Sequence, residues 1–390
     1  MPGPVTRQHG RRGPLDPVVA RARRALTASL PRPSAGDVDG TREGTVDALV
    51  ACSGGADSLA LAAVAAHLAR RGDARIGAVV VDHGLHPDSA GVADRAAEQC
   101  TALGLAPVIV ERVTVEAGGD GPEAAARRAR YRALDAAADR TGAGVVLLAH
   151  TLDDQAEQVL LGLLRGSGTR SLAGIPPHRG PFHRPFLHPE LGLTRADTEH
   201  VCAAEDLPWW DDPANHDPAY TRSHVRGTVL PLLTRELGPG VAAALARTAA
   251  IAARDADHLD AEAAELLDRI AERGPGWCRL PVRDLRAAPT ALLPRVLAAA
   301  AAHAGAHPLG RERIVALERL VAPRTTGPGS AGPVELPGGV TARRTARQLL
   351  PPTGADPAPG DSSAGGAGSA GAALDLRGPG LTADGATVAR

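Results

Sequence analysis

The sequence contains no lysine, so all 43 of its basic residues are arginine. A Walker-type phosphate loop needs a lysine on the β- and γ-phosphates, and a pyridoxal enzyme needs one to form a Schiff base. Both classes are therefore excluded. Aromatic residues make up only 2% of the chain, whereas 44% is hydrophobic and largely alanine. We therefore expect small side chains to pack helices against a sheet.

Cysteine is also scarce and scattered, with no Cys-x-x-Cys pair among Cys52, Cys100, Cys202 and Cys278. This pattern argues against zinc or iron–sulfur ligation and is typical of a reducing compartment. The chain also lacks a long apolar run of the kind found in membrane spans and signal segments. We expect a cytoplasmic protein with no membrane partner. Its net charge of −1 gives no global attraction for nucleic acid, so any such surface must be a local patch.

The most informative segment present is Ser53-Gly54-Gly55-Ala56-Asp57-Ser58, which follows an apolar run and precedes a long Ala/Leu stretch. The layout predicts a strand, a tight turn and a helix. Two glycines allow successive backbone N–H groups to point into one cavity at the positive end of the helix. The serines add hydroxyl donors, and the Asp57 carboxylate calls for a cation such as Mg²⁺ between it and a phosphate. A turn that binds nothing is the alternative, but the strand-to-helix junction favours a pyrophosphate site.

Apolar strands alternate with alanine-rich helices over the next hundred residues. The expected strands are Leu49–Cys52, Ile76–Val81, Pro107–Val110 and Val145–Leu148, and the expected helices are Ser58–Arg70, Ala90–Leu103, Pro122–Asp139 and Asp153–Leu164. This alternation predicts an α/β fold with a doubly wound parallel sheet, whose ligands bind at the carboxyl ends of the strands.

The composition divides the chain into four expected regions. Residues 1–17 are expected to be a disordered N-terminal tail, 18–237 the catalytic domain, and 238–322 a smaller, mostly helical domain. Residues 323–390 form a Gly/Pro/Ala-rich tail with a small hairpin at 333–350 and low-complexity sequence at 351–371.

Several polar groups follow the expected strands. Asp82 and His83 end the second strand, where the plain alternative is a turn capped by Asp82. Asp154 and Glu157 lie one turn apart at the start of a helix, where acids often only offset the helix dipole. Together with Asp57 they would form an electronegative pocket for Mg²⁺ or an amine.

Two further segments are rich in arginine. On the helix after the third strand, Arg127 and Arg130 share a face with Tyr131, and their planar guanidinium groups suit phosphate or RNA as well as a solvated, salt-bridged surface. Farther on, Trp209 and Trp210 precede Arg222 and Arg226 in a basic and aromatic region that suits RNA, although tryptophan is more often a core residue.

In order, the motifs SGGADS, VDHGL, EAAARRARY, LAHTLDDQAE, RGSG, RPFL, DDPAN and YTRSHVR resemble those of the tRNA(Ile)-lysidine synthase family, within the PP-loop ATP-pyrophosphatase superfamily. The resemblance covers about Asp47 to Leu233. It implies an enzyme that modifies the wobble cytidine of an isoleucine tRNA with a CAU anticodon. Oxygen 2 of the cytosine attacks the α-phosphate of ATP, pyrophosphate leaves, and the ε-amino group of free L-lysine then displaces AMP at carbon 2.

The resemblance also implies roles for individual residues. Asp57 and Asp154 would be catalytic and hold Mg²⁺. ATP would be bound by Ser53, Gly54, Gly55, Ala56, Asp57, Ser58, Asp82, His83 and Arg127. Lysine or tRNA would be bound by Glu157, Arg130, Arg165, Arg222 and Arg226. The helical domain would bind tRNA, and a homodimer is left open.

The sequence departs from the family pattern at Ser223, where asparagine is usual, and at His224 and Gly227, which leaves the tRNA contacts there open. A tRNA thiolation enzyme of the same superfamily is the nearest alternative, but it needs catalytic cysteines. A nucleotide-binding RNA-binding protein without activity would have no need of Asp57, Asp154 and Glu157 beside its phosphates.

Overall fold

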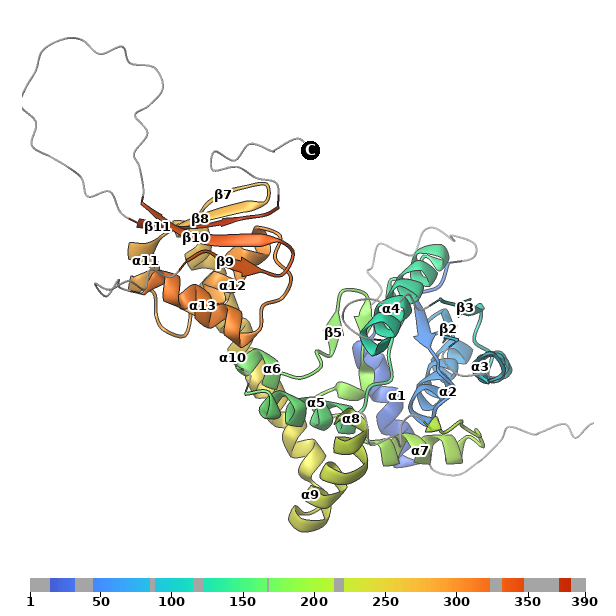
Figure 1. The fold of residues 1–390 in the computed structure, drawn as a ribbon. Coiled ribbons are helices and arrows are strands. Elements are labelled where there is room, and N and C mark those ends of the chain that lie inside the picture. The colour runs from blue at the N-terminus through green and yellow to red at the C-terminus, as the bar shows by residue number, and fades with distance from the viewer. Residues whose placement is uncertain are drawn as a thin grey trace, which may run out of the picture. The chain divides into compact units, whose positions relative to one another are not determined.

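The computed structural model describes residues 15–31, 45–84, 88–114, 122–166, 168–213, 221–322, 332–346 and 372–379. The chain divides into two compact units, Met1–Ala253 and Arg254–Arg390 (Figure 1). The division lies inside the 30-residue helix α10 (Val241–Ile270), later than the boundary at 237/238 expected from the sequence. A continuous helix crosses it, so no change in composition marks the place.

The first unit is built on a six-stranded sheet in the order β3-β2-β1-β4-β6-β5. Its strands are β1 (Ala48–Ala51), β2 (Ile76–Asp82), β3 (Val108–Arg112), β4 (Val145–Leu147), β5 (His178–Arg179) and β6 (Phe182–His183). Neighbouring strands run parallel except for the β5–β6 hairpin at one edge. The predicted doubly wound parallel sheet is confirmed.

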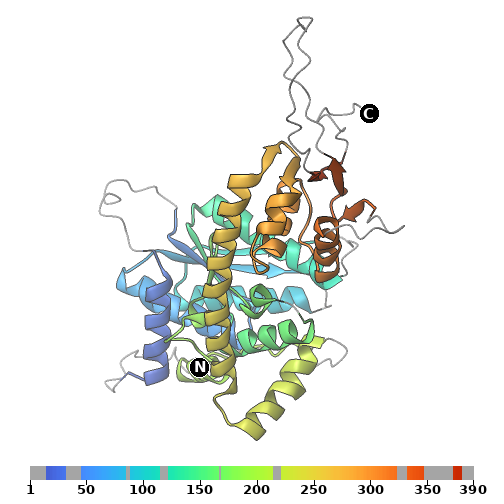
Figure 2. The same ribbon diagram turned by 90° about the vertical axis from the view of Figure 1, so that its left-hand side faces the viewer.

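Helices cover both faces of this sheet. Successive strand residues point to opposite sides, and apolar residues on both sides need cover from solvent. Val50 faces a core formed with α1 (Pro17–Ser29), α2 (Ala56–Arg71), α3 (Ser89–Leu103) and α7 (Arg195–Ala204). The next residue back, Leu49, faces a separate core formed with α4 (Pro122–Thr141). Figures 1 and 2 show α4 and α1 on opposite sides of the sheet. The core residues of α2 are largely alanine, as the composition predicted.

The strand order reverses at β1, since β2 and β3 lie on one side of it and β4 and β6 on the other. In a sheet of this kind the crevice at the carboxyl ends of the strands beside the reversal is the usual ligand site. The remaining helices of the unit are α5 (Leu152–Leu164), α6 (Thr169–Leu172), α8 (Thr221–His224) and α9 (Leu230–Leu237), with a 3₁₀ turn η1 (Pro185–Leu187) and a π-helix η3 (Val225–Val229).

The second unit combines helices with a five-stranded antiparallel sheet in the order β7-β8-β11-β10-β9. Its other elements are β7 (Glu272–Gly274), β8 (Trp277–Pro281), α11 (Val282–Ala287), α12 (Leu293–His303), α13 (Arg311–Val321), β9 (Val334–Leu336), β10 (Val340–Ala346) and β11 (Ala372–Arg377). The sequence predicted the helices and a hairpin at the position of β9 and β10. It missed β7 and β8, which lie in the region expected to be mostly helical, and it placed β11 in the tail.

Among the described residues, no single helix is long and apolar enough to span a membrane. The sharply bent pair formed by the segments Thr221–Leu237 and Val241–Ile270 passes the length and composition test only when the two are taken together.

The sheet of the second unit depends on β11, which lies between β8 and β10 and buries Leu374 and Leu376 completely. We predict that Leu374→Ala destabilises this unit by about 2–5 kcal/mol, because it leaves a cavity under the central strand. Arg343→Ala, on the exposed side of β10, is the matched control and should change stability by less than about 0.5 kcal/mol. Denaturant unfolding followed by hydrogen exchange of α12 measures both, and equal effects would show that β11 contributes nothing to the core.

Candidate active site

The loop between β1 and α2 adopts the compact turn that its glycines allow. Gly54 has a φ of +83°, a left-handed conformation that other residues rarely adopt. The Ser58 hydroxyl accepts a hydrogen bond from the Ser53 amide at 3.0 Å and donates one to the Gly55 carbonyl at 3.0 Å. Ser58 is buried and shapes the loop from within, so of the two serines Ser53 is the one exposed for a ligand.

A segment far along the chain lies on this loop. The Trp210 amide donates to the Gly54 carbonyl at 3.0 Å. Its neighbour Trp209 is 41% exposed, so the alternative of a core residue does not hold for that ring. The basic and aromatic region predicted from the sequence therefore begins beside the Ser53–Ser58 loop.

Asp57 stands in the first turn of α2 and accepts a hydrogen bond from Thr198 of α7. Burial raises the pKa of Asp57 to about 6, against the effect of the Thr198 hydroxyl, and the charge of Asp154 adds to the rise. The two carboxylates are thus close enough to repel each other, as expected from their positions at neighbouring strand ends.

Asp154 opens α5 in a capping box with Thr151, whose amide donates to its Oδ2 at 2.9 Å. Its Oδ1 accepts from Arg226 Nη2 at 2.9 Å. Burial would raise the pKa of Asp154, but the cationic groups around it, Arg195 and Arg226 among them, hold it below its ordinary value. Asp154 is therefore ionised in this environment.

Glu157 lies one turn later and is completely buried. Arg226 donates to it from Nε at 2.7 Å and from Nη2 at 3.0 Å, and Arg222 donates from Nε at 3.2 Å. Arg195 lies 3.5 Å from both Glu157 and Asp154. We call these two acids and three arginines the acid–arginine cluster. A carboxylate without solvent needs such partners, because an unpaired buried charge costs several kcal/mol.

The π-helix η3 carries Arg226 into this cluster. Arg222 and Arg226 are four residues apart, which places them on one helix face, and both reach Glu157. π-helical turns are rare and are often found at functional sites. Gly227, one of the departures from the family pattern, lies in the same turn and is exposed.

A second group of polar side chains comes from α4, whose Arg127, Arg130 and Tyr131 we call the α4 wall. The guanidinium groups of Arg127 and Arg130 lie 5.1 and 5.6 Å from the centre of the Tyr131 ring, and Arg184 donates to its hydroxyl at 3.3 Å. Burial lowers the pKa of Arg130. The predicted shared face of Arg127, Arg130 and Tyr131 is therefore real, and Arg130 is not a solvated surface charge.

His83 Nδ1, Arg130 Nε and His150 Nδ1 are among the buried polar atoms that lack a partner in the described part of the chain. Burial lowers the pKa of His150 to about 3 and also lowers that of His83, so both rings are neutral near pH 7. Buried polar groups are usually paired. Orphaned groups on three separate elements indicate a place that a polar ligand fills.

The carboxylates fit a cation shared with phosphate. Within the described part of the chain, no three His, Cys, Asp or Glu side chains are grouped to hold a metal alone. Mg²⁺ at a nucleotide site takes one or two carboxylates and completes its shell with phosphate oxygens and water. Asp57 and Asp154 supply two, and a cation between them would relieve the repulsion that helps to raise the pKa of Asp57.

Comparison with known proteins agrees with this geometry. Residues 36–233 match the family described as "PP-loop domain". A tRNA(Ile)-lysidine synthase of Leifsonia xyli subsp. xyli is 51% identical over 324 residues, which cover 82% of this chain and 95% of that protein. The chain belongs to the tRNA(Ile)-lysidine synthase family.

A second lysidine synthase, from Salinispora arenicola, is 46% identical over 348 residues, covering 88% of this chain and 98% of that protein. Among solved structures, a U34-tRNA thiolase from Methanococcus maripaludis covers 60% of this chain and 78% of its own, with 16% identity and a TM-score of 0.46. That likeness is too distant to inform on function.

Two other residues predicted from the lysidine synthase motifs, Asp82 and Arg165, lie outside the acid–arginine cluster. Asp82 accepts the Gly84 amide at 3.0 Å, so its carboxylate shapes the turn that presents His83, which was the plain alternative. Arg165 ends α5 and is exposed, about 16 Å along the helix from Asp154. It therefore lies outside the acid–arginine cluster. Parts of four motifs, at Leu85, at Ser167 and at both ends of residues 214–220, lie outside the described residues.

Sequence reasoning missed two residues that join this lysidine synthase site. Arg195 and Thr198 both come from α7, whose sequence shows only a helix start at Thr194. The Arg195 amide also donates to Asp153 at 2.8 Å, so Asp153 ties α7 to α5. Nothing in the linear pattern signals these contacts, since they connect segments about 40 and 140 residues apart.

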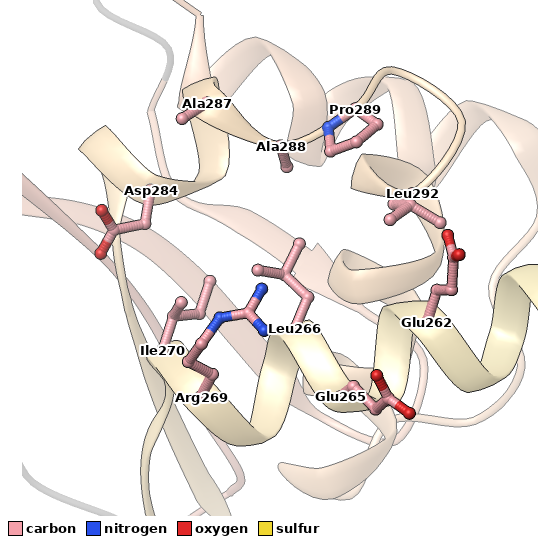
Figure 3. Close-up of a pocket in the computed structure, with 10 residues that line it drawn as sticks. All are labelled: Glu262, Glu265, Leu266, Arg269, Ile270, Asp284, Ala287, Ala288, Pro289 and Leu292. Carbon is pink, nitrogen blue, oxygen red and sulfur yellow. The ribbon is translucent and has the colours of Figure 1, made fainter.

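The second unit has a hollow of about 450 Å³ between α10, α11 and the start of α12. Figure 3 shows Arg269 between Leu266 and Ile270, with the carboxylates of Glu262 and Asp284 at opposite ends. Acids at its rim are unsuited to phosphate, so the hollow is not a second nucleotide site.

Because its pKa is raised, Asp57 is predicted to lower the stability of the folded protein by an amount that depends on pH. The folded protein takes up a proton between about pH 6 and the ordinary value of 3.8, so wild-type stability falls as pH rises through that window. Asp57→Asn should therefore be more stable than wild type at pH 8, by about 1–3 kcal/mol, and no more stable at pH 4.

Urea unfolding at both pH values measures this difference. The matched control is Asp73→Asn, an exposed surface residue that should show little change at either pH. A wild-type advantage at pH 8 would mean that the charge of the half-buried Asp57 is stabilised by its surroundings.

Proposed function

We propose that this chain attaches L-lysine to the wobble cytidine of the isoleucine tRNA with a CAU anticodon, forming lysidine at the expense of ATP. The observation that carries the proposal is the family membership, because the relative from Leifsonia xyli is named tRNA(Ile)-lysidine synthase and matches over 95% of its length. The phosphate loop and the acid–arginine cluster supply the groups that such a reaction needs. A tRNA substrate supports the expectation that the enzyme acts in the cytoplasm.

In the first step the cytosine oxygen 2 attacks the α-phosphate of ATP, an adenylated cytidine forms, and pyrophosphate leaves. Negative charge develops on the departing phosphates. The amides that follow Ser53 in the loop, at the N-terminus of α2, would stabilise it, and the left-handed turn at Gly54 supports this role. Arg127 and Arg130 on α4 would hold the nucleotide from the opposite wall.

Asp57 and Asp154 are the residues that would hold Mg²⁺. When bound there, the ion would supply positive charge between the carboxylates and the phosphate oxygens. The three orphaned groups, His83 Nδ1, Arg130 Nε and His150 Nδ1, would pair with polar atoms of the nucleotide or of the flipped base.

In the second step the ε-amine of lysine attacks carbon 2 of the activated ring, and AMP leaves. The predicted amine site at Glu157 is saturated by Arg222 and Arg226. An incoming ammonium would therefore exchange with one guanidinium in the acid–arginine cluster, which leaves the local charge unchanged. A homodimer stays a prediction.

The alternative of sulfur transfer is disfavoured by the thiols. All four cysteines are buried, and Cys278 lies in the second unit. A thiolase needs a thiolate that reaches the substrate. Cys52 and Cys202 instead pack under the loop, where Cys202 Sγ lies 3.2 Å from the Ala56 carbonyl.

The reaction can be tested with the purified full chain, ATP, Mg²⁺, labelled L-lysine and CAU-anticodon tRNA(Ile). We predict lysine incorporation and a cytidine heavier by one lysyl group in mass spectrometry. The methionine tRNA with the same anticodon is the matched control. Equal labelling of both tRNAs, or of neither, contradicts the proposal.

The metal role of Asp57 has its own test. We predict that Asp57→Ala lowers lysine incorporation by at least about a hundredfold while the protein stays folded, because the phosphate charge loses its cation anchor. Single-turnover incorporation and far-UV circular dichroism measure the two properties. Asp139→Ala, an exposed acid on α4, is the control. Normal turnover by Asp57→Ala would remove Asp57 from the mechanism.

A further inference from the structure

A hollow of about 430 Å³ lies in the first unit between the end of α1 and the β5–β6 hairpin. Leu30 and three prolines give it apolar walls, and His178, His183 and His188 line it together with Arg184. None of the described residues that line it is acidic. Its size is within the range of small-ligand sites.

Backbone contacts decide which nitrogen of two of these imidazoles carries the proton. His183 Nδ1 lies 2.6 Å from the Ser29 carbonyl, which can only accept, so Nδ1 is protonated and Nε2 is the ring nitrogen left to accept a hydrogen bond. His188 Nδ1 accepts the amides of Glu190 and Leu191, both at 3.2 Å, so its Nε2 is a donor. The hollow is therefore lined by one fixed acceptor and one fixed donor.

Arg184 adds a cation whose charge is not neutralised locally. It is 4% exposed, and its acceptors in the described part of the chain are neutral oxygens, namely the Pro176 carbonyl at 3.0 Å, the Phe182 carbonyl at 3.4 Å and the Tyr131 hydroxyl at 3.3 Å. Its Nε is buried with no partner among these residues. Through its hydrogen bond to Tyr131 the same arginine also contacts the α4 wall.

We infer that this hollow binds an unstacked nucleobase of the RNA substrate, next to the one that reacts. Every nucleobase carries a donor beside an acceptor on its Watson–Crick edge, which matches the pair at His188 and His183. The prolines, Leu30 and the imidazole faces pack against the ring, and Arg184 draws electron-rich atoms inward. The inference rests on the proposed function, because flipping the wobble base into the crevice leaves a neighbouring base of the loop without a stacking partner.

Two substitutions test the inference. His183→Ala removes the acceptor, and His188→Asn removes the Nε2 donor while keeping a side-chain oxygen for the two amides. We expect each to weaken binding of an anticodon stem-loop RNA about tenfold. Incorporation of lysine at saturating tRNA should stay within about twofold of wild type. His258→Ala, an exposed histidine of the second unit, is the matched control and should bind normally.

The base is located with stem-loops in which each loop nucleotide in turn is made abasic. One abasic position should weaken RNA binding by wild type and by His258→Ala. The same abasic position should cause no further loss of RNA affinity in His183→Ala and His188→Asn. Losses that add at every position, or variants that bind as wild type does, would overturn the inference. So would Zn²⁺ binding that His183→Ala abolishes without any change in RNA affinity.

The same assays separate this inference from the proposed function. Wild-type protein that binds the RNA but incorporates no lysine would defeat the proposed reaction alone. An active enzyme whose two histidine variants bind the RNA normally would defeat the base site alone.

Discussion

Glu157 has no exposure to solvent, and this constraint organises the catalytic edge of the first unit. A carboxylate in that position must be paired, so Arg222 and Arg226 are drawn to it from the segment that follows the irregular region. Arg226 also bonds to Asp154, and Arg195 reaches both acids from α7. Three helices that share no local sequence pattern are thereby joined at the carboxyl ends of the strands.

The charge balance of this edge explains how it could accept a nucleotide. Asp57, Asp154 and Glu157 are matched by three guanidinium groups, so the acid–arginine cluster has little positive charge left for phosphates. Neutralising a triphosphate then requires further cations, which fits a metal ion at Asp57 and the arginines of the α4 wall. The raised pKa of Asp57 reflects the cost of holding that carboxylate away from solvent and near Asp154.

Neutral imidazoles complement these charges. His83 and His150 have buried nitrogens without a partner among the described residues, whereas the Nδ1 atoms of His183 and His188 bond to the backbone. Burial lowers the pKa of His83 and His150, and a neutral ring suits the edge of a nucleobase better than a phosphate. In the proposed function, arginine would contact the backbone of the substrate and histidine its bases, in a chain that has no lysine.

The sequence by itself determined the parallel sheet, the loop between β1 and α2, and the placement of Asp57, Asp154 and Glu157 at strand ends, because periodicity and turn residues act over a few positions. Tertiary structure alone decided that the Ser58 hydroxyl bonds to the Gly55 carbonyl within the loop. It likewise decided that Thr198 bonds to Asp57, 141 residues away in sequence, and that Arg195 lies beside Asp154. It also decided that β11 lies between β8 and β10. Such contacts depend on which surfaces pack together, and packing between remote segments leaves no spacing in the linear chain.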